Sequence, residues 1–212
     1  MFVGIAGIIG AGKSTLTEGL ANEYDFESYH EPVQENDYLD DFYEKPERWA
    51  TIMQMHLLSK RFHQHQQIVW NSKNNKVVQD RTIYEDTIFA RLLNEDGIIP
   101  DREYETYRDH FDIMRRFLVY PDLIVYLDVK PEIALERVKK RGRDSEKSNG
   151  VDLGYLQRLR DGYEEFMDEM SFYTNTMKLD WNDYQPLENV RTKINEKIED
   201  CDRKHQRSLR RI

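Results

Sequence analysis

The chain has 212 residues, 33% of which are charged, and a net charge of −9 at neutral pH. This length predicts a single domain over 1–212 that can bury a substantial core. The acidic balance argues against a nucleic-acid binder, which would present a basic face, and no apolar run is long enough to span a bilayer. The one cysteine, Cys201, excludes a disulfide framework and a cysteine metal site. With an N-terminus that enters a strand at once and leaves no room for a leader, these features predict a cytoplasmic protein.

The N-terminal segment carries the phosphate-binding pattern G-x-x-x-x-G-K-[ST]. It consists of Gly7, Ile8, Ile9, Gly10, Ala11, Gly12, Lys13 and Ser14, with Thr15 next in the chain. The apolar run 2–6 before it predicts a buried strand, and apolar residues four apart in 14–24 predict a helix. These flanks argue against a chance match. We therefore expect loop N–H groups and Lys13 to bind a polyphosphate, and the Ser14 hydroxyl to hold Mg²⁺.

The remaining chain alternates strands and helices. Further strands are predicted at 27–30, 76–79, 122–128 and 177–179, and helices at about 36–44, 47–72, 84–95, 101–119, 131–141, 152–172 and 186–200. This alternation predicts an α/β fold with a parallel five-stranded sheet covered on both faces by helices. Ligands of such sheets bind beyond the carboxyl ends of the strands. The last residues, about 203–212, are rich in Lys and Arg and are expected to form a mobile basic tail.

Charged residues follow two of the predicted strands at their carboxyl ends. Glu31 follows the second strand, and Asp80 and Arg81 follow the third. An acid, an arginine and a phosphate loop converging on one sheet edge is the layout of a phosphoryl-transfer site, which needs a metal, charge neutralisation and a base for the acceptor hydroxyl. Glu31 is the candidate base and Asp80 the candidate metal partner. The alternative is that both are ordinary polar residues at strand ends.

An arginine cluster marks the end of the predicted helix 131–141. Arg137 and Arg141 are four apart and share a helix face, and Arg143 leads into a polar loop. The helix dipole favours basic residues at this end in any protein. Because the cluster precedes a loop in a chain that carries a phosphate loop, we interpret 141–150 as a lid whose arginines neutralise the transferring phosphoryl group.

Two polar residues, Gln54 and Arg61, are seven apart on the predicted helix 47–72, with Leu57 and Leu58 between them. A polar pair on a half-apolar face suits a pocket in which an amide meets the edge of a nucleobase. A solvent-facing surface is the alternative, and it is favoured for these two residues taken alone.

Six segments, in order and spacing, resemble the deoxynucleoside kinases, which include deoxycytidine, deoxyguanosine and bacterial deoxyadenosine kinases. They are the phosphate loop, Glu31-Pro32-Val33, Tyr43 to Trp49, Gln54 with Arg61, Asp80 to Asp86, and Arg137 to Glu146. The resemblance covers nearly the whole chain. It implies a P-loop NTPase-type fold with an arginine-bearing lid, ATP and Mg²⁺ as cofactors, a homodimer, and transfer of the γ-phosphoryl group of ATP to the 5′-hydroxyl of a deoxynucleoside.

The resemblance implies roles at the reaction centre and the donor site. Glu31 would accept the proton of the 5′-hydroxyl, and Arg81 would steady that carboxylate. The lid would carry Arg137, Arg141 and Arg143. Asp183 would lie close to the donor adenine.

It also implies how the nucleoside is held. Tyr43 and Glu146 would bind the 3′-hydroxyl, with the tyrosine placed where a 2′-hydroxyl would point. Gln54 would make a two-point contact with the base, and Arg61 and Asp86 would pair at its far edge.

The chain departs from the family in places. Asp80 stands where animal members have Glu, the run 34–37 replaces an aromatic residue, and Leu57 replaces a residue often small in deoxycytidine kinases. These departures indicate a bacterial-type or phage-borne enzyme. The Arg61–Asp86 pair favours a purine deoxynucleoside or deoxycytidine over thymidine.

Two other functions compete with this reading. A nucleoside monophosphate kinase, such as thymidylate kinase, has a strand and helix similar to 127–137, but Glu31 would repel the phosphate of its acceptor. A non-catalytic family member should have lost Lys13, Glu31 or Arg81, and all three are present. We therefore rank both below the deoxynucleoside kinase.

Overall fold

The structure is a computed structural model that describes residues 1–31, 36–141 and 151–209, with side chains described up to residue 200. Its centre is a sheet of five strands in the order β2-β3-β1-β4-β5. The strands are β1 (Phe2–Ala6), β2 (Phe26–Tyr29), β3 (Lys76–Asp80), β4 (Leu123–Asp128) and β5 (Asn175–Asp180). Every neighbouring pair is parallel. The predicted five-stranded parallel sheet is confirmed.

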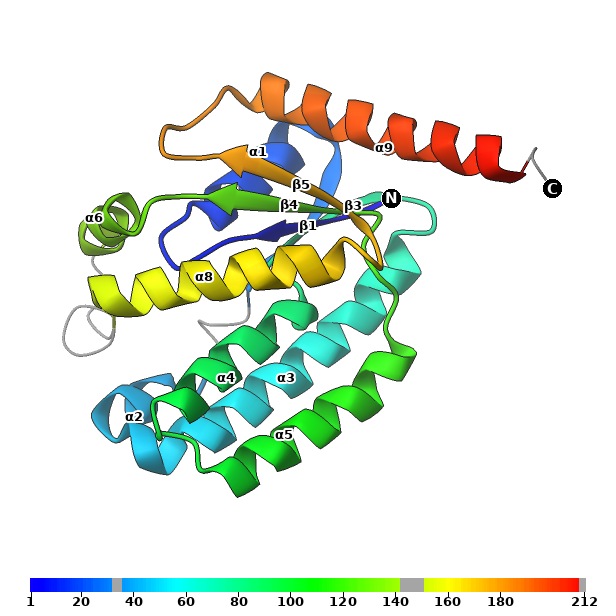
Figure 1. The fold of residues 1–212 in the computed structure, drawn as a ribbon. Coiled ribbons are helices and arrows are strands. Elements are labelled where there is room, and N and C mark those ends of the chain that lie inside the picture. Colours follow the sequence, from blue (N-terminus) through cyan, green and yellow to red (C-terminus); the bar gives the residue numbers. More distant parts are fainter. Residues whose placement is uncertain (32–35, 142–150, 210–212) are drawn as a thin grey trace.

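Helices cover both faces of the sheet. They are α1 (Lys13–Tyr24), α2 (Leu39–Glu44), α3 (Pro46–Asn71), α4 (Asp86–Glu95), α5 (Asp101–Met114), α6 (Pro131–Arg141), α8 (Leu153–Met170) and α9 (Leu187–Leu209), with short 3₁₀ turns η1 (Ile83–Glu85) and η2 (Arg115–Phe117). Figure 1 shows α1 and α9 on one side of the sheet and α8, with α3, α4 and α5, on the other. No helix of the described part of the chain is long and apolar enough to cross a membrane.

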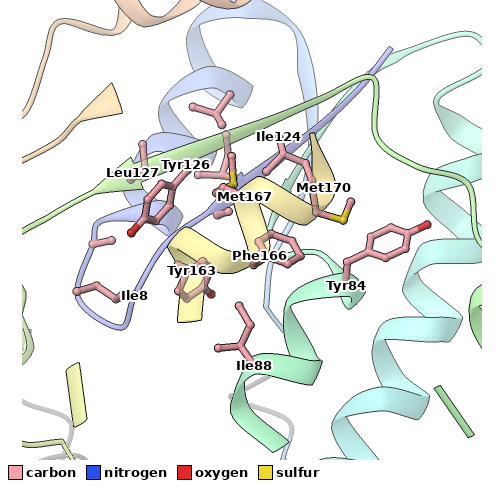
Figure 2. Packing of buried hydrophobic residues seen from close by; sticks show 14 of the residues in the cluster. Ile8, Tyr84, Ile88, Ile124, Tyr126, Leu127, Tyr163, Phe166, Met167 and Met170 are labelled. Atoms are coloured by element: carbon pink, nitrogen blue, oxygen red, sulfur yellow. The ribbon is translucent and has the colours of Figure 1, made fainter. Parts of the chain in front are cut away.

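The main hydrophobic core includes the layer between β4 and α8. The β4 residues from Leu123 to Leu127 are fully buried, as a run of apolar residues covered on both faces should be. Figure 2 shows Phe166, Met167 and Met170 of α8 packed against this strand. Because each large apolar side chain contributes roughly 1.5–3 kcal/mol when buried, this layer fixes α8 firmly beneath the sheet.

Several element boundaries differ from the sequence-based predictions, among them those at 84–95 and at the C-terminus. The segment predicted as one helix over 84–95 begins as η1, because Thr82 and Glu85 form a reciprocal capping box there. The C-terminal helix was expected to end near 200, but α9 continues to Leu209. Most of the segment expected as a mobile tail is therefore helical, and its basic residues lie at the helix end that the dipole favours for positive charge.

Candidate active site

The phosphate loop lies between β1 and α1, as the sequence predicts, and two of its glycines are required by the backbone. Gly12 precedes α1 with φ 97°, and Gly10 has φ 82°. A Cβ on Gly10 would lie 2.4 Å from the carbonyl oxygen of Ala134. Other residues rarely adopt positive φ, so both positions are restricted to glycine. The loop thus keeps the compact turn that phosphate binding needs.

Lys13, the first residue of α1, is buried and its Nζ donates to the carbonyl of Ile8 at 3.2 Å. Burial lowers its pKa to about 8, with Arg81 acting in the same direction and the carboxylates of Asp80 and Glu31 opposing it. Among the described residues the Lys13 ammonium donates only to this backbone carbonyl, so it can turn to a phosphate oxygen.

Ser14 and Asp80 meet at the start of α1. The Ser14 hydroxyl donates to Asp80 Oδ2, and Oδ1 of the same carboxylate is buried with no hydrogen-bond partner in the described structure. A hydroxyl and a carboxylate are the hard oxygen ligands that Mg²⁺ prefers, with water and phosphate oxygens completing its shell. The described residues contain no cluster of three or more His, Cys, Asp and Glu. The pair therefore fits a cation shared with a bound polyphosphate.

Glu31, two residues beyond β2, is clamped by two arginines. Its Oε1 accepts from Arg61 Nη2 at 2.8 Å and from Arg81 Nε at 2.9 Å. Burial would raise the pKa of this carboxyl, but Arg81 and Arg61 outweigh it and hold the pKa well below its usual range. Among the described residues only Oε1 takes these bonds. Glu31 is thus a permanent carboxylate that can offer Oε2 to a ligand.

Arg61 and Asp86 form the predicted pair, with Arg61 Nε 2.7 Å from Asp86 Oδ1, and both side chains are almost fully buried. Burial raises the pKa of Asp86 to about 7 in spite of Arg61. Arg61 Nη1 and Asp86 Oδ2 have no hydrogen-bond partner in the described structure. Together with the buried Gln54, they offer donors and acceptors to one planar ligand.

Arg81 is held by two residues that the sequence analysis did not assign to the site. Its Nη1 donates to the hydroxyl of Tyr163 on α8, which in turn donates to Glu85 Oε2 at 2.8 Å. Arg81 has a left-handed backbone, φ 62°, which costs about 1–2 kcal/mol in a non-glycine residue. The T-x-x-E spacing of Thr82 and Glu85 could have indicated the role of Glu85 as a cap. No local signal marks Tyr163.

Arg137 of α6 bonds to the backbone of the phosphate loop and of the segment after β5. Its guanidinium donates to the carbonyls of Ala11 at 3.1 Å, Trp181 at 3.0 Å and Asn182 at 2.8 Å. It also lies 4.4 Å from the ring centre of Tyr184. Backbone carbonyls satisfy a guanidinium at three points, so Arg137 braces the phosphate loop against the segment after β5. Its assignment to the lid stays a prediction.

These groups surround a single cleft of about 950 Å³, the upper size range of small-ligand sites. The sequence-predicted residues that line it are Ile9, Gly10, Gly12, Lys13, Ser14, Thr15, Glu31, Tyr43, Gln54, Arg61, Asp80, Arg81, Asp86, Arg137 and Arg141. Asp183 does not line the cleft, whereas its neighbour Tyr184 does. Tyr155 and Phe89 also line it, and the sequence analysis missed both. Arg143, Glu146 and the lid segment 142–150 lie outside the described residues.

Residues 3–201 match the family model described as deoxynucleoside kinase. The chain is 43% identical over 197 residues to a deoxyadenosine kinase of Dictyostelium discoideum, covering 93% of this chain and 79% of that protein. It is 36% identical over 166 residues to a deoxyadenosine/deoxycytidine kinase of Bacillus subtilis, covering 77% and 75%. A solved deoxyadenosine kinase from M. mycoides with bound dCTP is 30% identical with a TM-score of 0.81, covering 92% of this chain and 100% of that one. The chain belongs to the deoxynucleoside kinase family.

Proposed function

We propose that the protein transfers the γ-phosphoryl group of ATP-Mg²⁺ to the 5′-hydroxyl of a deoxynucleoside. The observation that carries this proposal is the meeting of the phosphate loop and the clamped carboxylate of Glu31 in one cleft. Both reactants of a phosphoryl transfer can therefore lie in line within the same site. Relatives named as deoxyadenosine, deoxyguanosine and deoxycytidine kinases support it.

At the donor end, the loop N–H groups and Lys13 would bind the phosphates. Ser14 and Asp80 would hold Mg²⁺, which neutralises charge on the triphosphate oxygens when bound. Arg141, which lines the cleft at the end of α6, and Arg143 would add positive charge beside the transferring group. Tyr184, which lines the cleft after β5, would lie close to the donor base, with Asp183 next to it in the chain.

At the acceptor end, Glu31 would receive the 5′-hydroxyl on Oε2 while both arginines hold Oε1. A carboxylate with a lowered pKa is a weak base for a free hydroxyl. In a loose phosphoryl-transfer transition state, however, there is little covalent chemistry for the protein to do, so that orientation matters most. Glu31 then takes the proton as the new bond to phosphorus forms. Tyr43 and Glu146 would hold the 3′-hydroxyl.

At the base end, the Arg61–Asp86 pair would select the base. Arg61 Nη1 can only donate and an ionised Asp86 Oδ2 can only accept. Adenine offers the complementary acceptor N7 and donor N6, and cytosine offers the donor N4, whereas thymine presents an acceptor and a methyl group. The pair therefore favours deoxyadenosine or deoxycytidine, and Gln54 can supply the second contact.

A nucleoside monophosphate kinase is not favoured. The acceptor phosphate would have to approach Glu31, which keeps its negative charge because two arginines hold its pKa low.

We also propose that the protein acts in the cytoplasm as a homodimer that binds no nucleic acid. The resemblance implies a dimer formed through two long helices, for which α4 and α5 are candidates. Their residues Leu92, Leu93 and Phe111 are buried within the protomer, whereas Phe117 of η2 is exposed and could serve such an interface.

Product analysis tests the proposal. Incubation with ATP-Mg²⁺ and deoxyadenosine should yield ADP and deoxyadenosine 5′-monophosphate, resolved by chromatography or ³¹P NMR. The matched control acceptor is 2′,5′-dideoxyadenosine, which keeps the base and the 3′-hydroxyl but lacks the reacting group. Phosphorylation of the control would place the product on another hydroxyl and refute the assignment of the site.

A further inference from the structure

The guanidinium of Arg81 is held on two sides. Nε donates to Glu31 Oε1 at 2.9 Å on the cleft side, and Nη1 donates to the Tyr163 hydroxyl on the core side. The residue is 2% exposed and its backbone is left-handed, with φ 62°. An unfavourable backbone at a non-glycine residue persists only where the surrounding contacts over-determine it. The contacts of Arg81 on its core side therefore help to hold this backbone conformation, as its contact with Glu31 does.

Tyr163 connects Arg81 to a second buried carboxylate. Its hydroxyl donates to Glu85 Oε2 at 2.8 Å, while Glu85 Oε1 accepts from the Thr82 N–H at 2.7 Å and the Thr82 hydroxyl at 3.1 Å. A guanidinium can only donate hydrogen bonds, so the tyrosine oxygen accepts from Arg81 and the tyrosine O–H is left to donate to Glu85. The direction of every bond from Glu85 to Arg81 is thereby fixed.

The tyrosine ring has no freedom to shift. Tyr163 is fully buried and stacks on Tyr126 of β4, with ring centres 5.7 Å apart and an interplanar angle of 7°. Figure 2 shows this ring between β4 and Ile88 of α4. The preceding residue, Gly162, lets α8 approach α4 closely, because a Cβ there would lie 2.8 Å from Ile88 Cγ2. The hydroxyl that meets Arg81 is thus fixed by the packing of α8.

We propose that Tyr163 and Glu85 are positioning residues for phosphoryl transfer, which hold the Arg81 guanidinium so that Nε meets Oε1 of Glu31. This inference rests on the proposed kinase function and goes beyond it. Neither Tyr163 nor Glu85 is among the residues that line the cleft. Their effect on the reaction therefore passes through Arg81, which keeps Oε1 of Glu31 occupied and leaves Oε2 to the acceptor hydroxyl.

The competing explanation is a purely structural role in the core. Arg81 Nη1 lies 3.8 Å from Glu85 Oε2, and removing one member of a buried charged network destabilises any protein. The two explanations differ in their readouts. A structural role changes the melting temperature, whereas a positioning role also changes kcat and its dependence on pH, because a loosened Arg81 stabilises the Glu31 carboxylate less.

The test is Tyr163→Phe, which removes one hydroxyl and keeps the ring. Its matched control is Tyr126→Phe, which removes the hydroxyl of the ring stacked on Tyr163, outside the Arg81 network. Steady-state kinetics use ATP-Mg²⁺ and the deoxynucleoside that the wild type phosphorylates best, from the lowest pH at which wild type and variants stay folded up to pH 9. We expect kcat of Tyr163→Phe to fall about tenfold with KM for the nucleoside nearly unchanged, the signature of an interaction made in the transition state. The acid limb of its kcat profile should move to higher pH.

A second variant, Glu85→Gln, keeps the shape of the side chain but places an amide N–H against the Tyr163 hydroxyl. Glu85→Gln should shift the acid limb of the kcat profile to higher pH, as Tyr163→Phe does. If Tyr163→Phe does not fold, the result for Glu85→Gln alone tests the positioning role. The proposal is overturned if either folded variant keeps the wild-type kcat and pH profile, if only the melting temperature changes, or if neither variant folds. Absence of transfer by the wild type, measured first, would instead refute the kinase function itself.

Discussion

Arg61 of α3 and Arg81, which follows β3, donate to the same atom, Oε1 of Glu31. Arg61 also pairs with Asp86 at 2.7 Å. The side chain proposed to meet the nucleobase is therefore also one of the two cations on the carboxylate proposed to receive the 5′-hydroxyl. Base recognition and chemistry share a residue, and replacements of Arg61 and Asp86 should have different consequences.

Replacing Arg61 by Gln should lower kcat for every deoxynucleoside by about tenfold or more, because preorganised charge around a reacting group is a large part of catalysis. Glu31 would keep only Arg81. The measurement is kcat for four deoxynucleosides, with the melting temperature as a control for folding. A variant that changes only the order of preferred bases, with kcat for its best substrate intact, would show that the Arg61–Glu31 bond has no part in turnover.

Replacing Asp86 by Asn should shift preference toward deoxyguanosine. The Asn oxygen can still accept from Arg61, while its N–H₂ donates where Asp86 Oδ2 accepted, and guanine presents acceptors at both O6 and N7. Ratios of kcat/KM for deoxyguanosine and deoxyadenosine measure the shift. Asp86→Ala, which removes the carboxylate completely, should also change the order of preferred bases. An unchanged order in both variants would mean that the base is recognised elsewhere.

The wild type should show a related dependence on pH. Because the pKa of Asp86 is raised to about 7, its ratio of kcat/KM for deoxyguanosine to that for deoxyadenosine should rise as pH falls below 7.

Replacing Glu31 by Gln should reduce turnover by roughly two to four orders of magnitude, the usual loss when a general base is removed. ATP binding, measured by calorimetry, should persist because the phosphate loop is untouched. Glutamine has nearly the same volume, so the loss would reflect charge and proton acceptance. Turnover within a few-fold of the wild type would remove Glu31 from this role.

The buried His65 predicts a loss of stability in acid. Its Nε2 accepts from the Val119 N–H at 3.1 Å, and burial lowers its pKa to about 4 from an ordinary 6.5. The unfolded chain therefore binds a proton first, and stability falls as pH drops from 6.5 toward 4, by roughly 3 kcal/mol in all. His65→Gln keeps an acceptor and does not titrate. Urea unfolding at pH 7.5 and 4.5 should show a smaller loss for the variant, and equal losses would exclude His65 as the cause.

Sequence patterns were sufficient for the sheet, for the phosphate loop and for the convergence of Glu31, Asp80 and Arg81, because parallel strands deliver their carboxyl ends to one edge. They were also sufficient, with the family resemblance, for the Arg61–Asp86 pair. The sharing of Arg61 between Asp86 and Glu31 could not be predicted, because it depends on how α3 lies against the segment after β2. The role of Tyr163 depends on the packing of α8, and the anchoring of Arg137 on backbone carbonyls far away in sequence.

The central claim is tested most directly by phosphate transfer from γ-labelled ATP to deoxyadenosine, deoxyguanosine, deoxycytidine, thymidine and their 5′-monophosphates, with and without a Mg²⁺ chelator. We predict labelling of the deoxynucleosides, least for thymidine, and loss of transfer when Mg²⁺ is chelated. Labelling of the monophosphates alone would contradict the account, because a phosphorylated acceptor would then have to lie against the carboxylate of Glu31.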